Sequence, residues 1–231
     1  MIGAVSWKAL GIKAVGRTIH QAFDPGRNYR NTREILRLAA HFTAKDVKNN
    51  EDSISIVPVD PSQAIRRGPK PILLHCKDHA DECKRICNIT DVFLHGDVPF
   101  NDIKITLQPQ DVGVLYARKL FRDHDIFKGF LKDLGTLAPV TWLNEDYYSR
   151  TKVFEQSIKV QTVASSKGLQ YRVVFVMWAD LFSPRSPSDA DLQQRFLYVA
   201  MTRASDVLVI TYSETNEFIE RMVASGDAVG K

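Results

Sequence analysis

Two uninterrupted apolar runs constrain the fold of this chain more than any other feature of its sequence. The first, VVFVMWA, spans residues 173–179, and the second, VLVITY, spans residues 207–212. Short runs of this kind are apolar on both faces, as is typical of strands that helices cover on both sides. They therefore predict a parallel sheet enclosed between two layers of helices.

The rest of the chain alternates between strand-like and helix-like segments. Further strands are expected at residues 53–59, 71–76, 111–118 and 157–164, and helices at 28–44, 78–96, 120–135, 191–204 and 215–225. This alternation is typical of crossover units and predicts an α/β fold with a mostly parallel sheet. We expect Asn31 or Thr32 to cap the first helix, Gly135 to end the third, and residues 62–71 to form a polar loop.

The composition excludes few classes of function. Of the 231 residues, 44% are hydrophobic and 25% are charged, and the formal net charge of +4 permits an anionic partner without requiring one. The chain has three cysteines, no apolar run of membrane-spanning length and no signal-peptide pattern at its N-terminus. These features predict a cytoplasmic protein with no membrane partner.

One cluster of metal-ligand residue types lacks the context of a metal site. His75, His79, Cys83 and Cys87 are spaced four apart, but His75 falls in a predicted strand. Four residues in a line do not converge on a tetrahedral ion. We therefore expect no metal site here and interpret both cysteines as core-facing residues.

A second pattern resembles a phosphate-binding loop. GIKAVGRT, residues 11–18, has the glycine spacing, but Arg17 stands where the lysine belongs. The long helix that such a loop requires is interrupted by Asp24, Pro25 and Gly26. Without that loop, Asp180 is interpreted as an exposed strand-end residue, and the chain is expected to lack its own P-loop.

Arg203 lies between a predicted helix and the strand at residues 206–212. The residues alone leave two interpretations open for it. It forms a salt bridge on the helix surface, or it binds phosphate oxygens, which its rigid fork of N–H donors suits well.

Three stretches resemble motifs of a known family. NYRNTREIL (28–36), VQTVASSKGLQYRVVFV (160–176) and RFLYVAMTRA (195–204) occur in this order. They resemble motifs IV, V and VI of the superfamily-one DNA helicases of the UvrD, Rep and PcrA type. In that family ATP lies between two RecA-like domains; the first carries the P-loop and the magnesium-binding acid, and the second carries these motifs.

The resemblance implies a domain organisation. Residues 28–231 would form the second RecA-like domain, with the three-layer fold of P-loop NTPases but no P-loop of its own. Residues 1–27 would be a remnant of the preceding interdomain region. The implied cofactors are ATP and Mg²⁺, the latter held by the missing first domain. The implied partners are single-stranded DNA and the N-terminal RecA-like domain of the same helicase.

The resemblance also implies roles at the nucleotide. Arg203 matches the arginine finger of motif VI, and Arg30 matches a second arginine that contacts the γ-phosphate. Tyr29 matches the aromatic residue that stacks on the base. In motif V, Gly168 allows a sharp turn beside the nucleotide, and Gln170 replaces a glutamate that accepts a hydrogen bond from the ribose.

The strand-binding part of motif V is implied at Thr162, Ser165, Ser166 and Lys167, which would contact backbone phosphates without reading sequence. Ala164 replaces a histidine of the family, so one strand contact is absent. About twenty residues separate LGTLAPV from VQTVASS. The helical domain that larger helicases insert at this point is therefore missing or minimal.

The implied function is that of the C-terminal motor domain of an ATP-dependent DNA helicase or translocase. This chain alone is expected to be inactive, because the P-loop and the magnesium-binding acid are absent. Two alternatives stay open. One is a stand-alone, non-catalytic module that binds single-stranded nucleic acid or docks on a partner. The other is a nucleotide-binding regulatory domain that has lost its chemistry.

Overall fold

A computed structural model describes residues 28–43, 59–96, 99–100, 103–104, 107–117, 124–184 and 186–231. Three predictions fall wholly or mostly outside the described residues. They are the interdomain remnant at residues 1–27, the loop-like stretch at 11–18 and the strand at 53–59.

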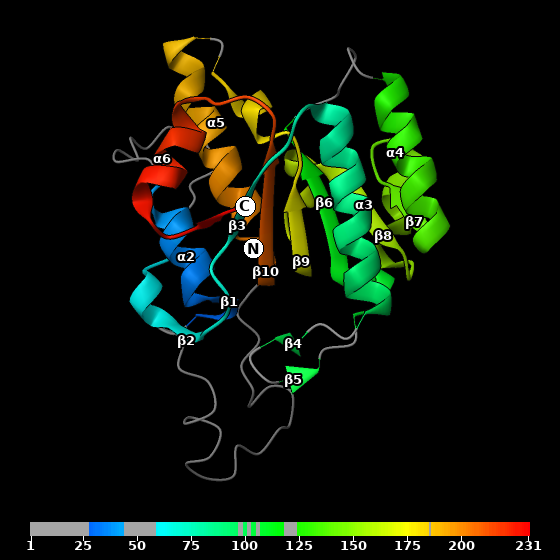
Figure 1. The fold of residues 1–231 in the computed structure, drawn as a ribbon, viewed down its shortest axis with the longest axis horizontal. Helices are drawn as coiled ribbons and strands as arrows, with labels where there is room; N and C mark the ends of the chain where they lie inside the picture. The colour runs from blue at the N-terminus through cyan, green and yellow to red at the C-terminus, as the bar shows by residue number, and fades with distance from the viewer. Residues whose placement is uncertain are drawn as a thin grey trace, which may run out of the picture.

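Seven parallel strands form the central sheet, in the order β11-β3-β10-β9-β6-β8-β7 (Figure 1). Their bounds are β3 Ile72–His75, β6 Val112–Tyr116, β7 Val140–Trp142, β8 Ile158–Thr162, β9 Tyr171–Val176, β10 Ala204–Tyr212 and β11 Val229–Gly230. The two apolar runs of the sequence become β9 and β10, which pair directly, with Val174 opposite Leu208. The predicted parallel sheet is therefore confirmed.

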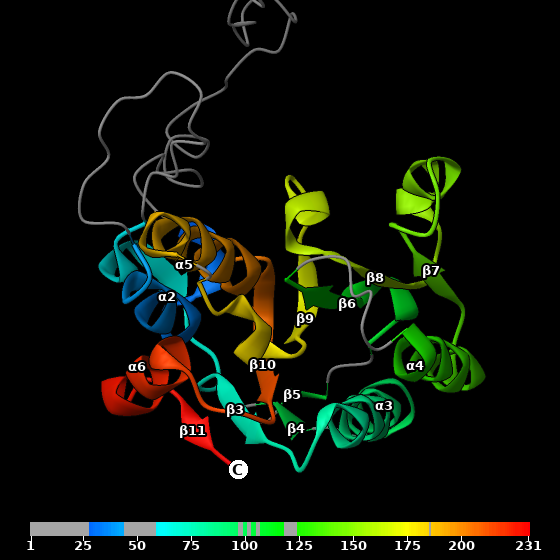
Figure 2. The same ribbon diagram turned by 90° about the horizontal axis from the view of Figure 1, so that it is seen from above.

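Helices cover both faces of the sheet (Figure 2). One face packs against α2 Arg33–Ala40, α5 Pro187–Met201 and α6 Glu217–Ser225. The other packs against α3 His79–His95 and α4 His124–Leu137. On β9, Val174 and Val176 join the first core, whereas Val173 and Phe175 join the second. Because successive side chains point to opposite faces, a strand between two helix layers must be apolar throughout, and the three-layer α/β prediction is confirmed.

The first helix begins later than its sequence pattern predicts. Residues Asn28–Thr32 form strand β1, which pairs in parallel with β2, Ala64–Arg66, inside the segment expected to be a polar loop. Helix α2 starts after Thr32, whose side chain accepts a hydrogen bond from the Ile35 amide. Of the two predicted caps, Thr32 is therefore the one used.

Helix α4 does not stop at Gly135, as predicted, but continues to Leu137. A Cβ atom at Gly135 would meet no atom within 4 Å. Glycine in an open helix position costs only about 1 kcal/mol relative to alanine, so the helix passes through it.

The remaining elements are short. They are the 3₁₀ helices η1 Pro61–Gln63, η2 Pro109–Asp111, η3 Tyr148–Phe154, η4 Val163–Ser166 and η5 Ala179–Phe182, and the hairpin strands β4 Pro99–Phe100 and β5 Ile103–Lys104. Only η3 lies between β7 and β8, as the short spacing before motif V predicts. Among the described helices, none combines the length and apolar character that crossing a membrane requires.

Candidate functional site

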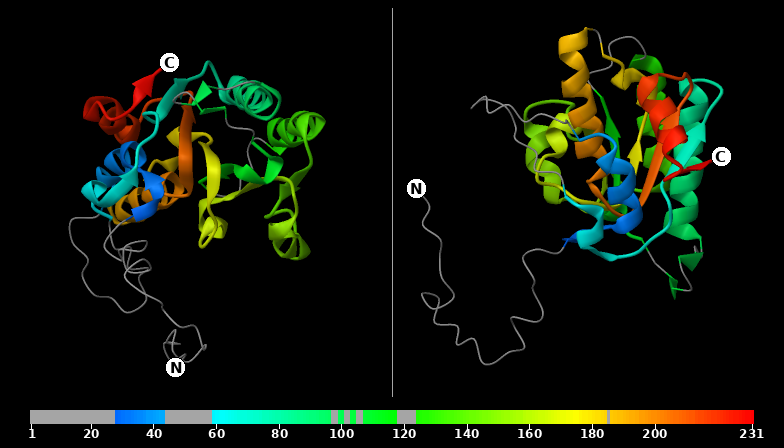
Figure 3. Two further views of the ribbon diagram at one scale, coloured as in Figure 1. Left: turned by 90° about the horizontal axis from the view of Figure 1, so that it is seen from below. Right: turned by 90° about the vertical axis from the view of Figure 1, so that its left-hand side faces the viewer.

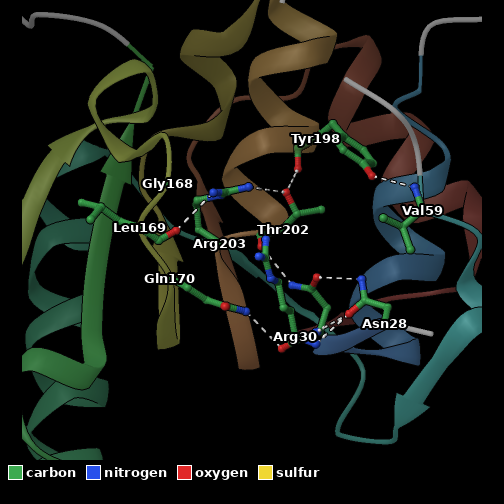
Figure 4. Close-up of a pocket in the computed structure, with 10 residues that line it drawn as sticks. Asn28, Arg30, Val59, Gly168, Leu169, Gln170, Tyr198, Thr202 and Arg203 are labelled. Carbon is green, nitrogen blue, oxygen red and sulfur yellow. Dashed lines mark hydrogen bonds between the residues drawn. The ribbon is translucent and has the colours of Figure 1, made fainter. Parts of the chain in front are cut away.

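A pocket of about 310 Å³ opens at the amino ends of β9 and β10 (Figure 4). Most of its lining comes from three segments that are far apart in the sequence: β1, the loop before β9, and the end of α5 with the turn that follows it; Val59 completes the lining. We call it the arginine pocket; its lining residues are Asn28, Arg30, Asn31, Val59, Gly168, Leu169, Gln170, Tyr198, Thr202 and Arg203. The structure therefore brings parts of all three motif-like stretches together.

Arg203 lies in the turn after α5, which ends at Met201, and uncharged acceptors fix its side chain. Nε donates to the Val199 carbonyl at 3.1 Å. Nη1 donates to the Leu169 carbonyl at 3.2 Å and Nη2 to the Thr202 hydroxyl at 3.4 Å (Figure 4). No carboxylate of the described residues forms a salt bridge with Arg203. The helix-surface ion pair, which was one interpretation of this residue, is thus not seen in the described part of the chain.

The electrostatics of the arginine pocket favour an anion. Burial lowers the pKa of Arg203 from its usual value, and the positive charge of Arg30 lowers that pKa further. Arg30 is exposed and lines the same pocket. Of the five N–H groups on the Arg203 guanidinium, three take part in the bonds described above, which leaves donors for a ligand. Phosphate oxygens suit two neighbouring guanidinium groups.

Asn31 holds the arginine pocket together, a role that its sequence position did not indicate. Its side chain is 4% exposed, and Nδ2 donates to the carbonyl oxygens of Thr202 at 2.9 Å and Ala204 at 2.6 Å. These bonds connect β1 to the turn that carries Arg203, across 171 positions of sequence. Asn31 is therefore a positioning residue rather than the helix cap.

Motif V contributes Gly168, Leu169 and Gln170 to the lining of the arginine pocket, and the roles of Gly168 and Gln170 at a nucleotide stay predictions. Gly168 has a φ of 85°, a left-handed conformation that glycine adopts without strain. Gln170 donates from Nε2 to the Arg30 carbonyl at 3.1 Å, and this bond leaves its amide oxygen as an acceptor. Tyr29 lies on β1 but is not among the residues that line the pocket, and its stacking role stays a prediction.

The predicted strand-binding loop follows β8 and begins with η4. The Thr162 hydroxyl lies 3.0 Å from the Ser165 hydroxyl and accepts the Ser165 amide. Asn144 accepts the Thr162 amide at 2.7 Å and donates to the Ser165 hydroxyl at 2.8 Å. Asn144 lies in the turn after β7, and no local pattern of the sequence indicates its role. Both hydroxyls are thus tied into a network that fixes the loop.

Ser166 does not present its side chain as predicted. It is 0% exposed, and its hydroxyl donates to the Val163 carbonyl at 2.7 Å. The geometry therefore argues against a phosphate contact by this hydroxyl, because the group is buried and already bonded. Lys167, the next residue, is exposed.

A second pocket, of about 480 Å³, lies between η3 and η4. We call it the η3–η4 groove; it is lined by Leu143, Arg150, Val153, Gln161, Ala164, Ser165, Lys167 and Leu169. Both charged side chains in this lining, Arg150 and Lys167, are cations. Leu169 lines the arginine pocket as well, so the two pockets are neighbours.

Asp180 is not the exposed strand-end residue that the sequence predicted. It is 8% exposed, and its carboxylate lies 3.0 Å from His79 Nε2 and accepts the Ser213 amide at 3.3 Å. His79, Glu82 and Asp180 are the one group of three potential metal ligands found in the described residues, with ligand atoms within 4.8 Å of one another.

Glu82 is fully buried in this group and ties α3 to the sheet. It accepts hydrogen bonds from the Thr211 hydroxyl at 2.6 Å and from the Trp178 amide at 3.1 Å. Burial raises the pKa of Glu82 to about 7. The two hydrogen bonds of Glu82 join α3 to β10 and to the segment after β9. Cys83 and Cys87 pack in the core beneath α3, as predicted, and His79 turns to Asp180 instead of to them.

Comparisons with known proteins support the family resemblance. Residues 158–211 match the model of the UvrD-like helicase C-terminal domain. A stretch of 59 residues is 44% identical to the RecBCD enzyme subunit RecB of Chlamydia trachomatis serovar D, covering 26% of this chain and 6% of that subunit. Residues 158–211 are therefore similar to the UvrD-like helicase C-terminal domain, which confirms the resemblance drawn from motifs V and VI.

The fold has a counterpart among solved structures. The C-terminal domain of a possible DNA helicase from Lactobacillus plantarum WCFS1 superposes with a TM-score of 0.53 at 13% identity. The match covers 88% of this chain and 98% of that one. At this identity the match shows the fold alone, which is a parallel sheet between two layers of helices.

Proposed function

We propose that this chain is the C-terminal motor domain of an ATP-dependent DNA helicase or translocase, and that it completes an ATP site with Arg203 and Arg30. The observation that carries the proposal is that these two guanidinium groups line one pocket, at which the helicase-like motifs converge, with no carboxylate among its lining residues. The match of residues 158–211 to a helicase family supports it.

The residues of the arginine pocket suit the terminal phosphates of ATP. The nucleotide would lie between this domain and the N-terminal RecA-like domain of the same helicase, whose P-loop and Mg²⁺ position the phosphoryl group for transfer. Arg203 and Arg30 would hold the γ-phosphate. Gln170 would accept from the ribose, and Tyr29 would stack on the base. Because carbonyl groups already fix Arg203, it stabilises developing charge without reorganising first.

The same domain would contribute to the track for single-stranded DNA through the loop at Thr162–Lys167. Leu169 would link the ATP site to the DNA track, because its carbonyl accepts a hydrogen bond from Arg203 and because Leu169 lines both pockets. A shift of Arg203 on nucleotide binding would therefore act on the chain next to Lys167. This coupling accounts for stepping along the strand when ATP binds and is hydrolysed.

The second candidate is a non-catalytic module that binds single-stranded nucleic acid or docks on a partner. The η3–η4 groove favours it, because Arg150 and Lys167 line that groove independently of the arginine pocket. The two functions differ in whether the arginine pocket binds phosphate.

Thermal unfolding in sodium pyrophosphate tests the proposal on this chain. A ligand that binds only the native state raises Tm by mass action. We expect pyrophosphate to raise Tm more than sodium chloride of equal ionic strength. The extra rise should disappear in the Arg30→Ala Arg203→Ala double variant. Lys132→Ala removes an exposed charge from α4, on the other side of the sheet, and should keep the rise. Equal shifts in the double variant and the wild type would leave the non-catalytic module as the better proposal.

A further inference from the structure

The segment around η3 exposes three large aromatic side chains. Tyr147 is 77% exposed, Tyr148 is 74% exposed and Phe154 is 92% exposed. Neighbouring exposed rings on a folded domain mark an interaction site more often than chance, because each costs free energy in water. None of the roles proposed above uses them.

The helical phase assigns one of these rings to the η3–η4 groove. In a 3₁₀ helix, residues three apart share a face. Arg150 and Val153 of η3 line the groove. Tyr147 precedes Arg150 by three positions and has helical backbone angles, φ −65° and ψ −37°. Tyr147 therefore continues the groove face, whereas Tyr148 and Phe154 share the neighbouring one.

Tyr148 supports Tyr147 from the side. Their ring centroids are 5.8 Å apart and the rings are almost perpendicular, at 86°. An edge-to-face contact of this kind restricts a side chain and covers at most one of the two faces of its ring. Tyr147 is 77% exposed, so a face of its ring stays available to a planar group.

The opposite wall of the groove is the loop of motif V. Ala164, Ser165 and Lys167 belong to it, and Asn144 binds it to the chain that leads into η3. Figures 2 and 3 show the two short segments, η4 in yellow and η3 in yellow-green, rising on the same side of the sheet. The distance between the walls is therefore fixed by the fold.

The charges at the groove favour a polyanion. Arg150 and Lys167 line it, and no carboxylate is in its lining. Three acids lie near Arg150 in the sequence, Glu145, Asp146 and Glu155, and none of them lines the groove. Glu145 is exposed, and the other two accept hydrogen bonds from neighbouring residues.

We infer that Tyr147 is a base-stacking residue, and that a single strand of nucleic acid lies in the η3–η4 groove with its phosphates at Arg150 and Lys167. An aromatic face beside cations is the combination by which proteins hold single strands regardless of sequence, since every base has a π face. The choice of nucleic acid as the occupant rests on the proposed function. The identity of the stacking residue rests on the groove.

Fluorescence anisotropy with two labelled oligonucleotides tests this on the 231-residue chain. One is oligo(dT), and the other has the same length and backbone but only abasic sites. Stacking on one aromatic residue is worth ~5–150-fold in affinity. The wild type should bind oligo(dT) more tightly than the abasic strand by a factor in that range. Tyr147→Ala should bring the two affinities together, and Tyr147→Phe should restore the difference.

Phe154→Ala is the matched control, because it removes a still more exposed ring from the neighbouring face and should keep the preference for bases. A preference that survives Tyr147→Ala, or that Phe154→Ala abolishes equally, overturns the assignment of Tyr147. If the wild type binds both strands equally, stacking is wrong, whereas the phosphate track of the proposed function stands. If it binds neither strand, the proposed track fails as well.

Discussion

The Arg203 guanidinium donates a hydrogen bond to the Leu169 carbonyl at 3.2 Å, joining two segments that lie 34 positions apart in the sequence. Arg203 follows α5, and Leu169 precedes β9 beside Lys167. The bond places the arginine that we propose binds phosphate in direct contact with the chain that follows the predicted strand track. A movement of Arg203 in the arginine pocket would therefore act through this hydrogen bond on Leu169, which also lines the η3–η4 groove.

Arg203→Ala in the complete helicase should lower kcat for ATP hydrolysis by ~10³–10⁵-fold, because an arginine finger acts on charge that develops in the transition state. Arg203→Lys should rescue poorly, since an ammonium group lacks the two-pronged geometry. DNA affinity should change little. Steady-state turnover measured beside a thermal melt checks this. Near-normal turnover in the alanine variant would refute the role.

The 231-residue chain alone should hydrolyse no measurable ATP. Arg203 and Arg30 stabilise charge, but they do not position a triphosphate or a metal ion. A coupled assay with and without Mg²⁺ measures this. Clear, metal-dependent turnover by the pure chain would contradict the prediction and would favour residues 11–18 as a phosphate-binding loop.

Binding of single-stranded DNA by this chain should be weak, sensitive to salt and indifferent to sequence, because phosphate contacts carry no sequence information. Lys167→Ala should reduce the slope of log K against log salt by ~0.7. Lys132→Ala, on α4, serves as the control and should leave that slope unchanged. Titrations at several salt concentrations measure both. Tight binding that persists at high salt would count against the proposed track.

Asn31→Ala should lower the free energy of unfolding by about 2 kcal/mol. It removes two buried hydrogen bonds and leaves the Thr202 and Ala204 carbonyls without their donor. Asn88→Ala, at an exposed position of α3, should change stability by less than about 0.5 kcal/mol. Urea unfolding of both variants measures the difference. Equal effects would show that Asn31 does not anchor β1.

Glu82→Gln should remove a pH dependence of stability. The pKa of Glu82 is about 7 in the native state, against 4.5 in its ordinary setting, because burial disfavours the carboxylate. The native state therefore prefers the protonated form. The stability that protonated Glu82 contributes is fully present below pH 4.5 and is lost as pH rises through 7. Relative to Glu82→Gln, the free energy of unfolding of the wild type should fall by about 3 kcal/mol between pH 4.5 and pH 8. Denaturant titrations at these pH values test it, and parallel profiles would contradict it.

The sequence by itself determined the layers of the fold. Apart from Thr211, the runs at residues 173–179 and 207–212 consist of apolar and aromatic residues, and a strand with helices on both faces buries side chains of this kind on both sides. Local chemistry also determined several helix ends. Asp78 caps α3, Gly96 follows its last residue, and Gly226 adopts the left-handed conformation after α6. Such signals act within one turn of chain, so they are readable without the fold.

Motif order also predicted which distant segments converge. Arg30, Gly168, Gln170 and Arg203 line one pocket, as the resemblance implies, whereas Tyr29 does not. Their chemical roles remain predictions, because the described geometry contains the donors but tests no ligand.

Only the tertiary structure decided how individual polar side chains are used. Ser166 and Asp180 looked exposed in sequence but are buried, and Asp180 has as its partner His79, which lies 101 positions away. Asn31 looked like a cap but reaches across to Thr202. Burial and partner choice depend on residues that the fold brings together from far along the chain, whereas periodicity and capping report only the nearest turn. A polar residue therefore reveals its role only when the opposing surface is known.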